Sequence, residues 1–503
     1  MLVKRAILNF LAASLDQAAR LIVVFMLAPV MLVGLGDALF GYWQILIKTN
    51  HQLLPLDGRS SETLKWVVAR SQSEDEVHKR QMMLGASIAV WLICLPVQLI
   101  VAYVVYRHLP EWSQVDDRAV QVSQFAGWIL IANIVFLTAV SMFEAVFRGM
   151  NIGYKRAGLM AVTTLVGGVL MIIAINAGGG LVAVASVQAA TTFLYLTVFS
   201  VVVKHHLPWL AIKIPHRSDV IDCVKKSAWF ALWAFVSTLI FLGEVVLLGL
   251  FGNASLVSKY VVTAFAVQSI VVIVSTAVMA ALPGLGGVIG KGDYVKARSI
   301  RKESLAYTWV LACCIAGLTV LFNESFVANW VGSAKFAGNF ESLIIVVCAL
   351  QLVFIRQDAA MINLAIDVRQ KVKYSLASAL VCIVLAAFLV PLYGIVGVCL
   401  AMLIGRSILS YFFPRIIGQF LRFDEEKFES VKPLYNIVIV AVVVLVCFYI
   451  SSFLTMANWF SLIVSAAILM PIFFYFSYRL LLSADHRDLL LQRLYSLKTD
   501  RRL

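Results

Sequence analysis

Long apolar runs, each separated from the next by a short polar stretch, follow one another along the whole chain. A helix needs about 20 predominantly apolar residues to cross the hydrocarbon core of a bilayer. About fourteen runs reach this length, so each predicts a membrane-spanning helix. They cover residues 8–34, 39–58, 82–106, 122–147, 157–177, 181–203, 227–251, 258–282, 304–325, 341–366, 374–392, 395–417, 434–454 and 458–482.

The composition supports this pattern. Of 503 residues, 62% are apolar and 14% are charged, whereas soluble domains carry about 25% charged residues. A soluble globular chain, a disordered chain and an outer-membrane barrel are therefore excluded. The first run contains Asp16 and Arg20 and is too long for the apolar region of a signal peptide, so it is interpreted as the first span. We predict an all-α polytopic membrane protein.

Basic residues gather in alternate loops, which fixes the expected orientation. The loops on one side carry most of the Lys and Arg, and both chain ends belong to this set. The opposite loops hold Arg107, Arg118, Lys259 and Lys335. Because cytoplasmic loops are enriched in Lys and Arg, both termini are expected in the cytoplasm. The same rule accounts for the net charge of +14 without nucleic acid, and the basic tail 483–503 is expected to lie on an anionic leaflet.

No motif for a metal or a nucleotide occurs. The eight cysteines form no CxxC pair, and seven of them lie inside apolar runs, where a cysteine acts as a small apolar side chain. P-loop and HExxH patterns are absent. We therefore expect no cofactor and no metal.

The chain contains an internal repeat. Residues 154–196 and 368–410 share a layout of helix, Gly-containing turn and helix, at an offset of 214 residues. The repeat predicts two pseudo-symmetric six-helix lobes, 1–204 and 226–417, joined by a cytoplasmic linker at 205–225. Residues 418–482 then form two extra helices. In transporters with parallel repeats, the substrate site lies between the lobes.

Short motifs with this order and spacing resemble the Wzx-type polysaccharide (O-antigen) flippases of the MOP superfamily. The resemblance covers nearly the whole chain, although each motif alone is weak. The matching motifs are Leu35-Gly36 with Gly41-Tyr42, Phe147-Arg148-Gly149, Leu248-Gly249 with Gly252 and Tyr260, Pro283-Gly284 with Gly290 and Gly292-Asp293, and Tyr393-Gly394 with Gly397. One departure is Glu244, which stands where the family more often has Asp.

The resemblance implies movement of a polyprenyl-pyrophosphate-linked oligosaccharide from the cytoplasmic to the periplasmic leaflet, for O-antigen, lipopolysaccharide, capsule or exopolysaccharide assembly. It implies alternating access in a cationic cavity, without covalent chemistry, so the protein is not expected to be an enzyme. The implied partners are this lipid-linked substrate, membrane lipids and other polysaccharide-assembly membrane proteins.

Five cations inside or beside the spans are candidates for binding the pyrophosphate: Arg20, Lys48, Arg59, Arg356 and Arg406. Charges at this depth cost several kcal/mol unless they face a cavity or a partner. The alternative is that three of these cations pair with a nearby acid. The pairs would be Arg20 with Asp16, Arg59 with Asp57 and Arg356 with Asp358. Lys48 and Arg406 have no acid within one helical turn in the sequence, which makes them the stronger candidates.

Four acids are candidates for ion coupling: Asp16, Glu144, Glu244 and Asp358. The repeat offset of 214 relates Glu144 to Asp358, so the two acids are expected at equivalent places in the lobes, facing each other at the cytoplasmic mouth. The alternative pairs Glu144 with Arg148 one turn later, and Asp358 with Arg356 or a neighbouring helix.

Two other function classes fit a chain of this kind less well. A multidrug or organic-cation antiporter of the same superfamily predicts a cavity dominated by acids, whereas embedded cations outnumber embedded acids here. A membrane enzyme acting on the same lipid predicts a large catalytic loop, and the longest polar loops are about 20 residues. Within the flippase class, a lipid II flippase predicts an Arg-Asp dipeptide in the first span, which the spacing of Asp16 and Arg20 does not match.

Overall fold

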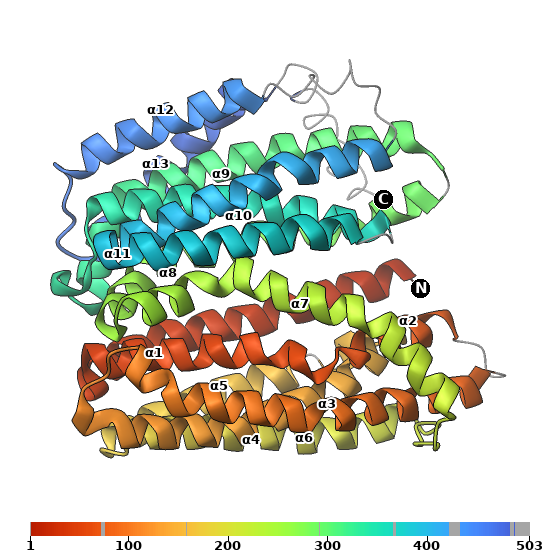
Figure 1. Ribbon diagram of the computed structural model, residues 1–503. Coiled ribbons are helices and arrows are strands. Elements are labelled where there is room, and N and C mark those ends of the chain that lie inside the picture. The colour runs from red at the N-terminus through yellow and green to blue at the C-terminus, as the bar shows by residue number, and fades with distance from the viewer. Residues whose placement is uncertain are drawn as a thin grey trace. The chain divides into compact units, whose positions relative to one another are not determined.

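The computed structural model describes residues 2–71, 76–156, 158–290, 292–365, 369–421, 433–482 and 487, and this part of the chain is helical without strands (Figure 1). The helices are α1 (Leu2–Leu53), α2 (Ser60–Arg70), α3 (Val77–Trp112), α4 (Asp117–Gly149), α5 (Leu159–Asn176), α6 (Gly180–His206), α7 (Arg217–Phe251), α8 (Ala254–Gly290), α9 (Tyr294–Val331), α10 (Asn339–Ile362), α11 (Arg369–Phe420), α12 (Pro433–Ser451) and α13 (Trp459–Leu481). Short 3₁₀ turns η1 (Leu54–Asp57), η3 (Gly153–Arg156), η4 (Ser333–Lys335) and η5 (Asn363–Ala365) connect some of them.

The predicted all-α membrane fold is confirmed. Eleven segments in the described residues are long and apolar enough to cross a membrane. The segments in α1 and α11 each contain two of the predicted spans. One more predicted span, 258–282, lies in α8, which is not among the eleven segments. Every one of the predicted spans therefore has a helix. The tail 483–503, which is predicted to lie on the membrane surface, is outside the described residues except for Arg487.

Two glycines divide the longest helices. Gly36 in α1 has φ +78°, and Gly394 in α11 has φ +53°. Glycine adopts positive φ at little cost because it has no Cβ. Each 52-residue helix therefore doubles back at its glycine, and Figure 1 shows the two halves of each running in opposite directions. The tight hairpins expected from the Gly-containing motifs are present.

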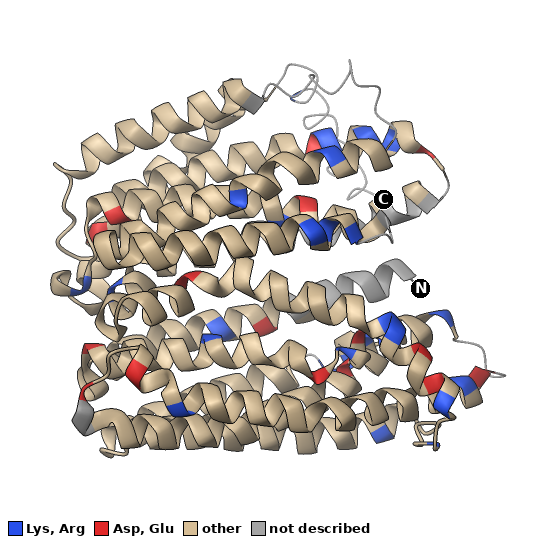
Figure 2. Ribbon diagram, in the orientation of Figure 1, with Lys and Arg blue, Asp and Glu red and all other residues tan. Residues whose placement is uncertain are grey.

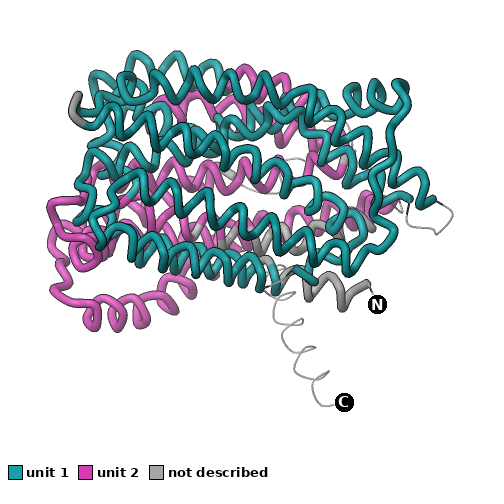
Figure 3. Tube along the Cα trace, turned by 90° about the horizontal axis from the view of Figure 1, so that it is seen from below, with its two compact units in different colours: residues 1–261, 379–398 teal, residues 262–378, 399–503 magenta. Residues whose placement is uncertain are grey.

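The chain divides into two compact units (Figure 3). Unit 1 comprises residues 1–261 and 379–398, and unit 2 comprises residues 262–378 and 399–503. These boundaries follow packing, whereas the predicted lobes follow an internal repeat. The lobe boundaries therefore stay a prediction.

Aromatic residues fill the core of unit 1 where α2, α3, α4 and α6 meet. Phe147 of α4 has no exposed surface and packs edge-on against Phe199 of α6, with ring centroids 5.1 Å apart. Tyr195 stacks on the same Phe199 ring at 5.4 Å. Gly149 ends α4 against α2, and a Cβ there would approach the Lys65 carbonyl oxygen to 2.8 Å. This packing fixes the C-terminal end of α4, which carries Glu144.

Part of the predicted linker, residues 207–216, packs against α3. Residues 207–216, which we call the strap, have no helical or strand structure and run beside the start of α3. Gln81 Nε2 donates a hydrogen bond of 2.7 Å to the Trp209 carbonyl oxygen. A Cβ at Gly85 would lie 1.9 Å from the Lys213 carbonyl oxygen, so the strap backbone rests directly on this glycine.

In unit 2, α9 is the central helix, packing against α10, α12 and α13. Asn323 of α9 has 2% exposure, and its Nδ2 donates to the Thr263 carbonyl oxygen at 2.9 Å and to Ser342 Oγ at 2.8 Å. Gly317 lets the Phe473 ring of α13 approach the α9 backbone. The Asn323 bonds tie α9 to α8 and α10, and the Phe473 contact ties α13 to α9.

Candidate functional site

Glu144, near the end of α4, is the centre of a charged network in unit 1. Arg156 Nη1 donates to Glu144 Oε1 at 2.6 Å, and Arg148 Nη2 donates to Oε2 at 2.9 Å. The Arg148 contact spans one helical turn and is the pairing that the sequence offered as an alternative. Arg156 comes from η3, and sequence reasoning placed it only among the loop charges. Both carboxylate oxygens of Glu144 therefore have cationic partners.

Four more residues join this network around Arg156. Its Nη1 donates to Tyr195 Oη at 2.9 Å and lies 3.3 Å from Met160 Sδ. Asp16 of α1 is 4% exposed and within electrostatic range of Arg156, Arg20 and Glu144. Arg20 is exposed, and its Nη2 lies 3.7 Å from the same Met160 sulfur. The structure thus brings together three predicted residues: Asp16, Arg20 and Glu144.

Charged residues of both signs also gather around α2 (Figure 2). Arg59 caps α2 in the left-handed conformation, with φ +46°, and its backbone N–H donates to Asp57 Oδ1 at 2.8 Å. The expected proximity of Arg59 and Asp57 is therefore made through the backbone. Burial alone would raise the pKa of the Glu62 carboxyl, but the charges of Lys65 and Arg59 outweigh burial and hold this pKa below its usual value.

In unit 2, Asp358 forms a buried ion pair. Arg301 Nη1 of α9 lies 3.0 Å from Asp358 Oδ1 of α10, and the two side chains are 7% and 8% exposed. The sequence offered Arg356 or a neighbouring helix as the partner, and the structure shows the neighbouring helix. Arg301 lies 57 positions earlier in the chain, so no local spacing pointed to it.

The end of α10 around Asp358 is held from two sides. Lys371 of α11 has no exposed surface, and its Nζ donates to the Ala359 carbonyl oxygen at 2.8 Å and to Asn363 Oδ1 at 2.7 Å. A cation at the C-terminus of a helix stabilises its last carbonyl groups and its dipole. On the other side, Gln357 Nε2 donates to Ser304 Oγ of α9 at 2.8 Å. The Ala359 backbone is therefore tied to α11, and the Gln357 side chain is tied to α9.

A groove with a volume of about 620 Å³ opens beside this ion pair within unit 2. Each of four helices contributes one face to it, and most of the lining is apolar. The lining residues are Arg301, Lys302, Leu305 and Trp309 from α9; Val347, Leu350, Gln351, Phe354, Ile355 and Asp358 from α10; Leu403, Ser410 and Pro414 from α11; and Ile437, Val440, Ala441 and Val444 from α12.

The groove is polarised along its length. Its charged residues lie where α9 begins and α10 ends, and its other end is apolar. At about 1.5 Å per residue, the α10 wall from Val347 to Asp358 is roughly 16 Å long, about half of the hydrocarbon thickness of a bilayer. Trp309 and Phe354 pack together on the wall with ring centroids 4.2 Å apart. The groove therefore joins an apolar length to a charged end.

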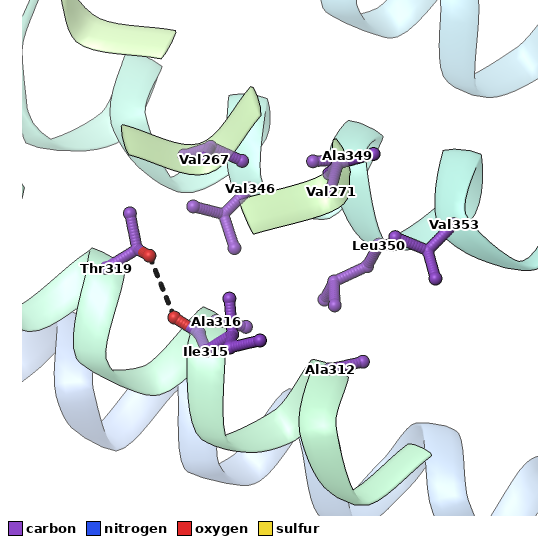
Figure 4. Close-up of a pocket in the computed structure, with 10 residues that line it drawn as sticks. All are labelled: Val267, Val271, Ala312, Ile315, Ala316, Thr319, Val346, Ala349, Leu350 and Val353. Carbon is purple, nitrogen blue, oxygen red and sulfur yellow. Dashed lines mark hydrogen bonds between the residues drawn. The ribbon is translucent and has the colours of Figure 1, made fainter. Parts of the chain in front are cut away.

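A second cavity in unit 2 is far smaller than the groove. About 20 Å³ is enclosed by aliphatic side chains of α8, α9 and α10, as Figure 4 shows. Its polar group, the Thr319 hydroxyl, donates to the Ile315 carbonyl oxygen at 2.8 Å. A space of this size admits about one water molecule. We therefore interpret it as a packing void.

The remaining predicted residues lie apart from the groove lining. Lys48 is on the second half of α1, within electrostatic range of His51. Arg20, on the first half of α1, is also within electrostatic range of His51, because the turn at Gly36 folds the two halves together. Arg406 of α11 is fully buried, and Glu244 of α7 is 7% exposed. Arg356 precedes the ion-paired Asp358 by two residues on α10.

Comparisons with known proteins identify the fold. No family model matches the chain, and no curated protein does. Solved structures of similar fold include the lipid II flippase MurJ in an inward closed conformation, with a TM-score of 0.66 and 14% identity over 94% of this chain and 99% of that one. A variant of the Vibrio cholerae MATE transporter VcmN gives a TM-score of 0.61 and 14% identity over 84% and 98%. An inward-facing multidrug resistance MATE transporter of the MOP superfamily gives 0.59 and 13% over 87% and 98%. The structural neighbours are thus MOP superfamily transporters.

Proposed function

We propose that the chain is a flippase that moves a polyprenyl-pyrophosphate-linked oligosaccharide across the bacterial inner membrane for surface polysaccharide assembly. Both termini are then cytoplasmic, and the cations Arg20, Lys48, Arg59, Arg356 and Arg406 contact the substrate during the cycle. The polarised groove of unit 2 carries this proposal, because a polyprenyl diphosphate has an extended apolar chain that ends in an anion.

The charge of the groove favours this substrate over an organic cation. Two cations, Arg301 and Lys302, and one acid, Asp358, line its charged end. An organic cation would meet a net positive charge there, whereas a diphosphate would be attracted to both basic side chains. The structural neighbours include a lipid II flippase as well as multidrug transporters, so both classes of substrate belong in the test.

Reconstitution of the purified protein in liposomes separates the two classes. A lipid-linked oligosaccharide with a fluorescent sugar is placed in both leaflets, and quenching by an impermeant reductant measures the fraction exposed outside. We expect the protein to accelerate exchange between leaflets at least tenfold over empty liposomes. Uptake of a fluorescent organic cation under a proton or sodium gradient is the second arm. Cation uptake without exchange of the lipid-linked sugar would replace this proposal with the multidrug alternative.

Neutral replacement of Lys48 or Arg406 should reduce transport. Each is a cation within an apolar span, where charge is costly unless it serves a partner or a substrate. We expect Lys48→Gln and Arg406→Gln to lower surface polysaccharide by about tenfold or more, measured together with the amount of protein in the membrane. Normal export by both variants at wild-type protein level would exclude these residues as substrate contacts.

The four acids Asp16, Glu144, Glu244 and Asp358 are proposed to couple transport to an ion gradient. Asp16 and Glu144 share the network around Arg156, so an anionic substrate that draws Arg20 away alters the charge that surrounds both acids. Linkage then requires that protonation of these acids and substrate binding affect each other equally.

A further inference from the structure

The contact between Arg301 and Asp358 is a short ion pair in which the N–H is poorly aligned with the carboxylate oxygen. The two charged atoms, Nη1 and Oδ1, are 3.0 Å apart. Nevertheless, Asp358 Oδ1 is buried and receives no well-aligned hydrogen bond, while Arg301 Nη1 donates to Met361 Sδ at 2.9 Å. Arginine forms its strongest contacts when its N–H groups point at carboxylate or phosphate oxygens. The acid therefore compensates the charge of Arg301 without fully using its donors.

Asp358 is poorly placed to improve this contact. Lys371 ties the neighbouring Ala359 carbonyl to α11, and Gln357 is tied to Ser304 of α9. These contacts hold this part of α10 in place, so the longer Arg301 side chain is the partner with more freedom to move. That side chain and the half-buried Lys302 both line the charged end of the groove. A short movement of Arg301 thus exchanges one anion, the carboxylate, for another in the groove.

We propose that Arg301 and Lys302 form a diphosphate site at the charged end of the groove, and that Asp358 is an internal anion that competes with the ligand for Arg301. This inference rests on the proposed function, since it names the part of the lipid carrier that the groove holds. In the empty protein the carboxylate neutralises a buried arginine, whose uncompensated burial would be costly. When a diphosphate arrives, its oxygens take the N–H groups that Asp358 leaves unused.

This arrangement has a consequence for ligand choice. The competing carboxylate lowers affinity for every anion, so only a ligand that also fills the apolar length of the groove gains enough contact to displace it. Inorganic pyrophosphate should therefore bind far more weakly than a diphosphate that carries a prenyl chain. A ligand must therefore make both the apolar contacts of a prenyl chain and the ionic contacts of a diphosphate to bind tightly at this site.

The test is binding of farnesyl pyrophosphate and of inorganic pyrophosphate to the full-length protein in nanodiscs of zwitterionic lipid. We expect Asp358→Asn to tighten farnesyl pyrophosphate binding about tenfold, because the competitor is removed while the side-chain volume is kept. Arg301→Gln should weaken binding at least tenfold, and Lys302→Gln should weaken it less. In the Arg301→Gln background, Asp358→Asn should have little further effect. Inorganic pyrophosphate should bind at least a hundredfold more weakly than the prenyl compound.

Glu303→Gln is the matched control. Glu303 is an adjacent buried acid on α9 whose carboxylate accepts a hydrogen bond from Tyr307, and it does not line the groove. We expect the Glu303→Gln variant to bind farnesyl pyrophosphate as tightly as the wild type does. Unchanged or weaker binding in Asp358→Asn, or wild-type binding in Arg301→Gln, would overturn the inference. If Asp358→Asn is not recovered from membranes, the Arg301→Gln/Asp358→Asn double variant and Lys302→Gln decide, since both must bind more weakly than the wild type.

The liposome assay keeps this inference separate from the proposed function. If the wild-type protein exchanges lipid-linked sugar between leaflets but the variants bind farnesyl pyrophosphate alike, only the diphosphate site is wrong. If the wild type exchanges no lipid-linked sugar, the proposed function fails, whatever the binding results.

Discussion

Replacing Gly41 with alanine should prevent unit 1 from reaching its folded state. The second half of α1 crosses the start of α8 at this residue, and an ideal Cβ would lie 1.7 Å from the Ala254 carbonyl oxygen and 3.1 Å from the Ser258 backbone nitrogen. These are backbone atoms, so no side chain can rotate away. Overpacking in a well-packed core typically costs about 1–3 kcal/mol, and we expect Gly41→Ala to exceed this range. The measurement is the fraction of membrane-inserted protein that elutes as a single species in mild detergent.

Gly167→Ala provides the control for this substitution. Gly167 also lies within an apolar helix, α5, but the nearest atom to its Cβ is the Thr191 methyl carbon at 3.2 Å. A side chain can yield by a few tenths of an ångström, so the control should stay within about 1 kcal/mol of the wild type and elute normally. Equal elution profiles for Gly41→Ala and Gly167→Ala would show that the close approach of α1 and α8 is not required.

Removal of the Glu144 carboxylate should destabilise the protein by about 3 kcal/mol. Glu144→Ala removes the carboxylate that forms an ion pair with Arg156, and the Arg156 side chain is 13% exposed. Breaking a buried ion pair from one side costs about 3–5 kcal/mol, because the remaining charge stays buried without compensation. The contribution of Arg148 is smaller, because its side chain is 52% exposed. The expected result is a clear fall in the thermal unfolding midpoint of the detergent-solubilised protein.

Two further variants test the physical reason. Asp222→Ala removes an acid from another i,i+4 ion pair, with Lys226 at 3.3 Å, whose side chains are 66% and 59% exposed; we expect a loss below about 1 kcal/mol. The Glu144→Ala/Arg156→Met double variant removes both half-buried charges and should recover much of the lost stability. If Glu144→Ala and Asp222→Ala lower the midpoint equally, the network contributes no more than a surface pair.

The helices could be predicted from the sequence because each depends on the local length of an apolar run. Gly36 and Gly394 were also readable, since a glycine between two apolar runs indicates a sharp reversal of the chain. The positions of the units along the chain could not be read in this way, because packing between helices leaves no local pattern. Residues 379–398 pack with unit 1 although the chain on both sides belongs to unit 2.

The candidate site was only partly readable. The pair of Glu144 and Arg148 follows from helical spacing, whereas Arg156 reaches the same carboxylate across a turn. Arg301 and Lys302 were interpreted only as part of the positive charge of a cytoplasmic loop. The groove itself gave no signal, because helix faces that line a groove and helix faces that contact lipid are both apolar. Its recognition requires the positions of α9, α10, α11 and α12 together.

The seating of the strap on Gly85 determines how the connection before α7 responds to proteolysis. Lys213 and the neighbouring Ile214 have exposed side chains, and Ile214 is 92% exposed. Judged by sequence and exposure alone, the peptide bond between them is a good trypsin site, because trypsin cleaves after lysine. Cleavage, however, needs the carbonyl group of that bond to enter the protease, and the Lys213 carbonyl rests against α3. Susceptibility of a loop depends on how its backbone is held as well as on its exposure. The native protein should therefore resist trypsin here until the strap lifts from α3, which makes this bond a reporter of local opening.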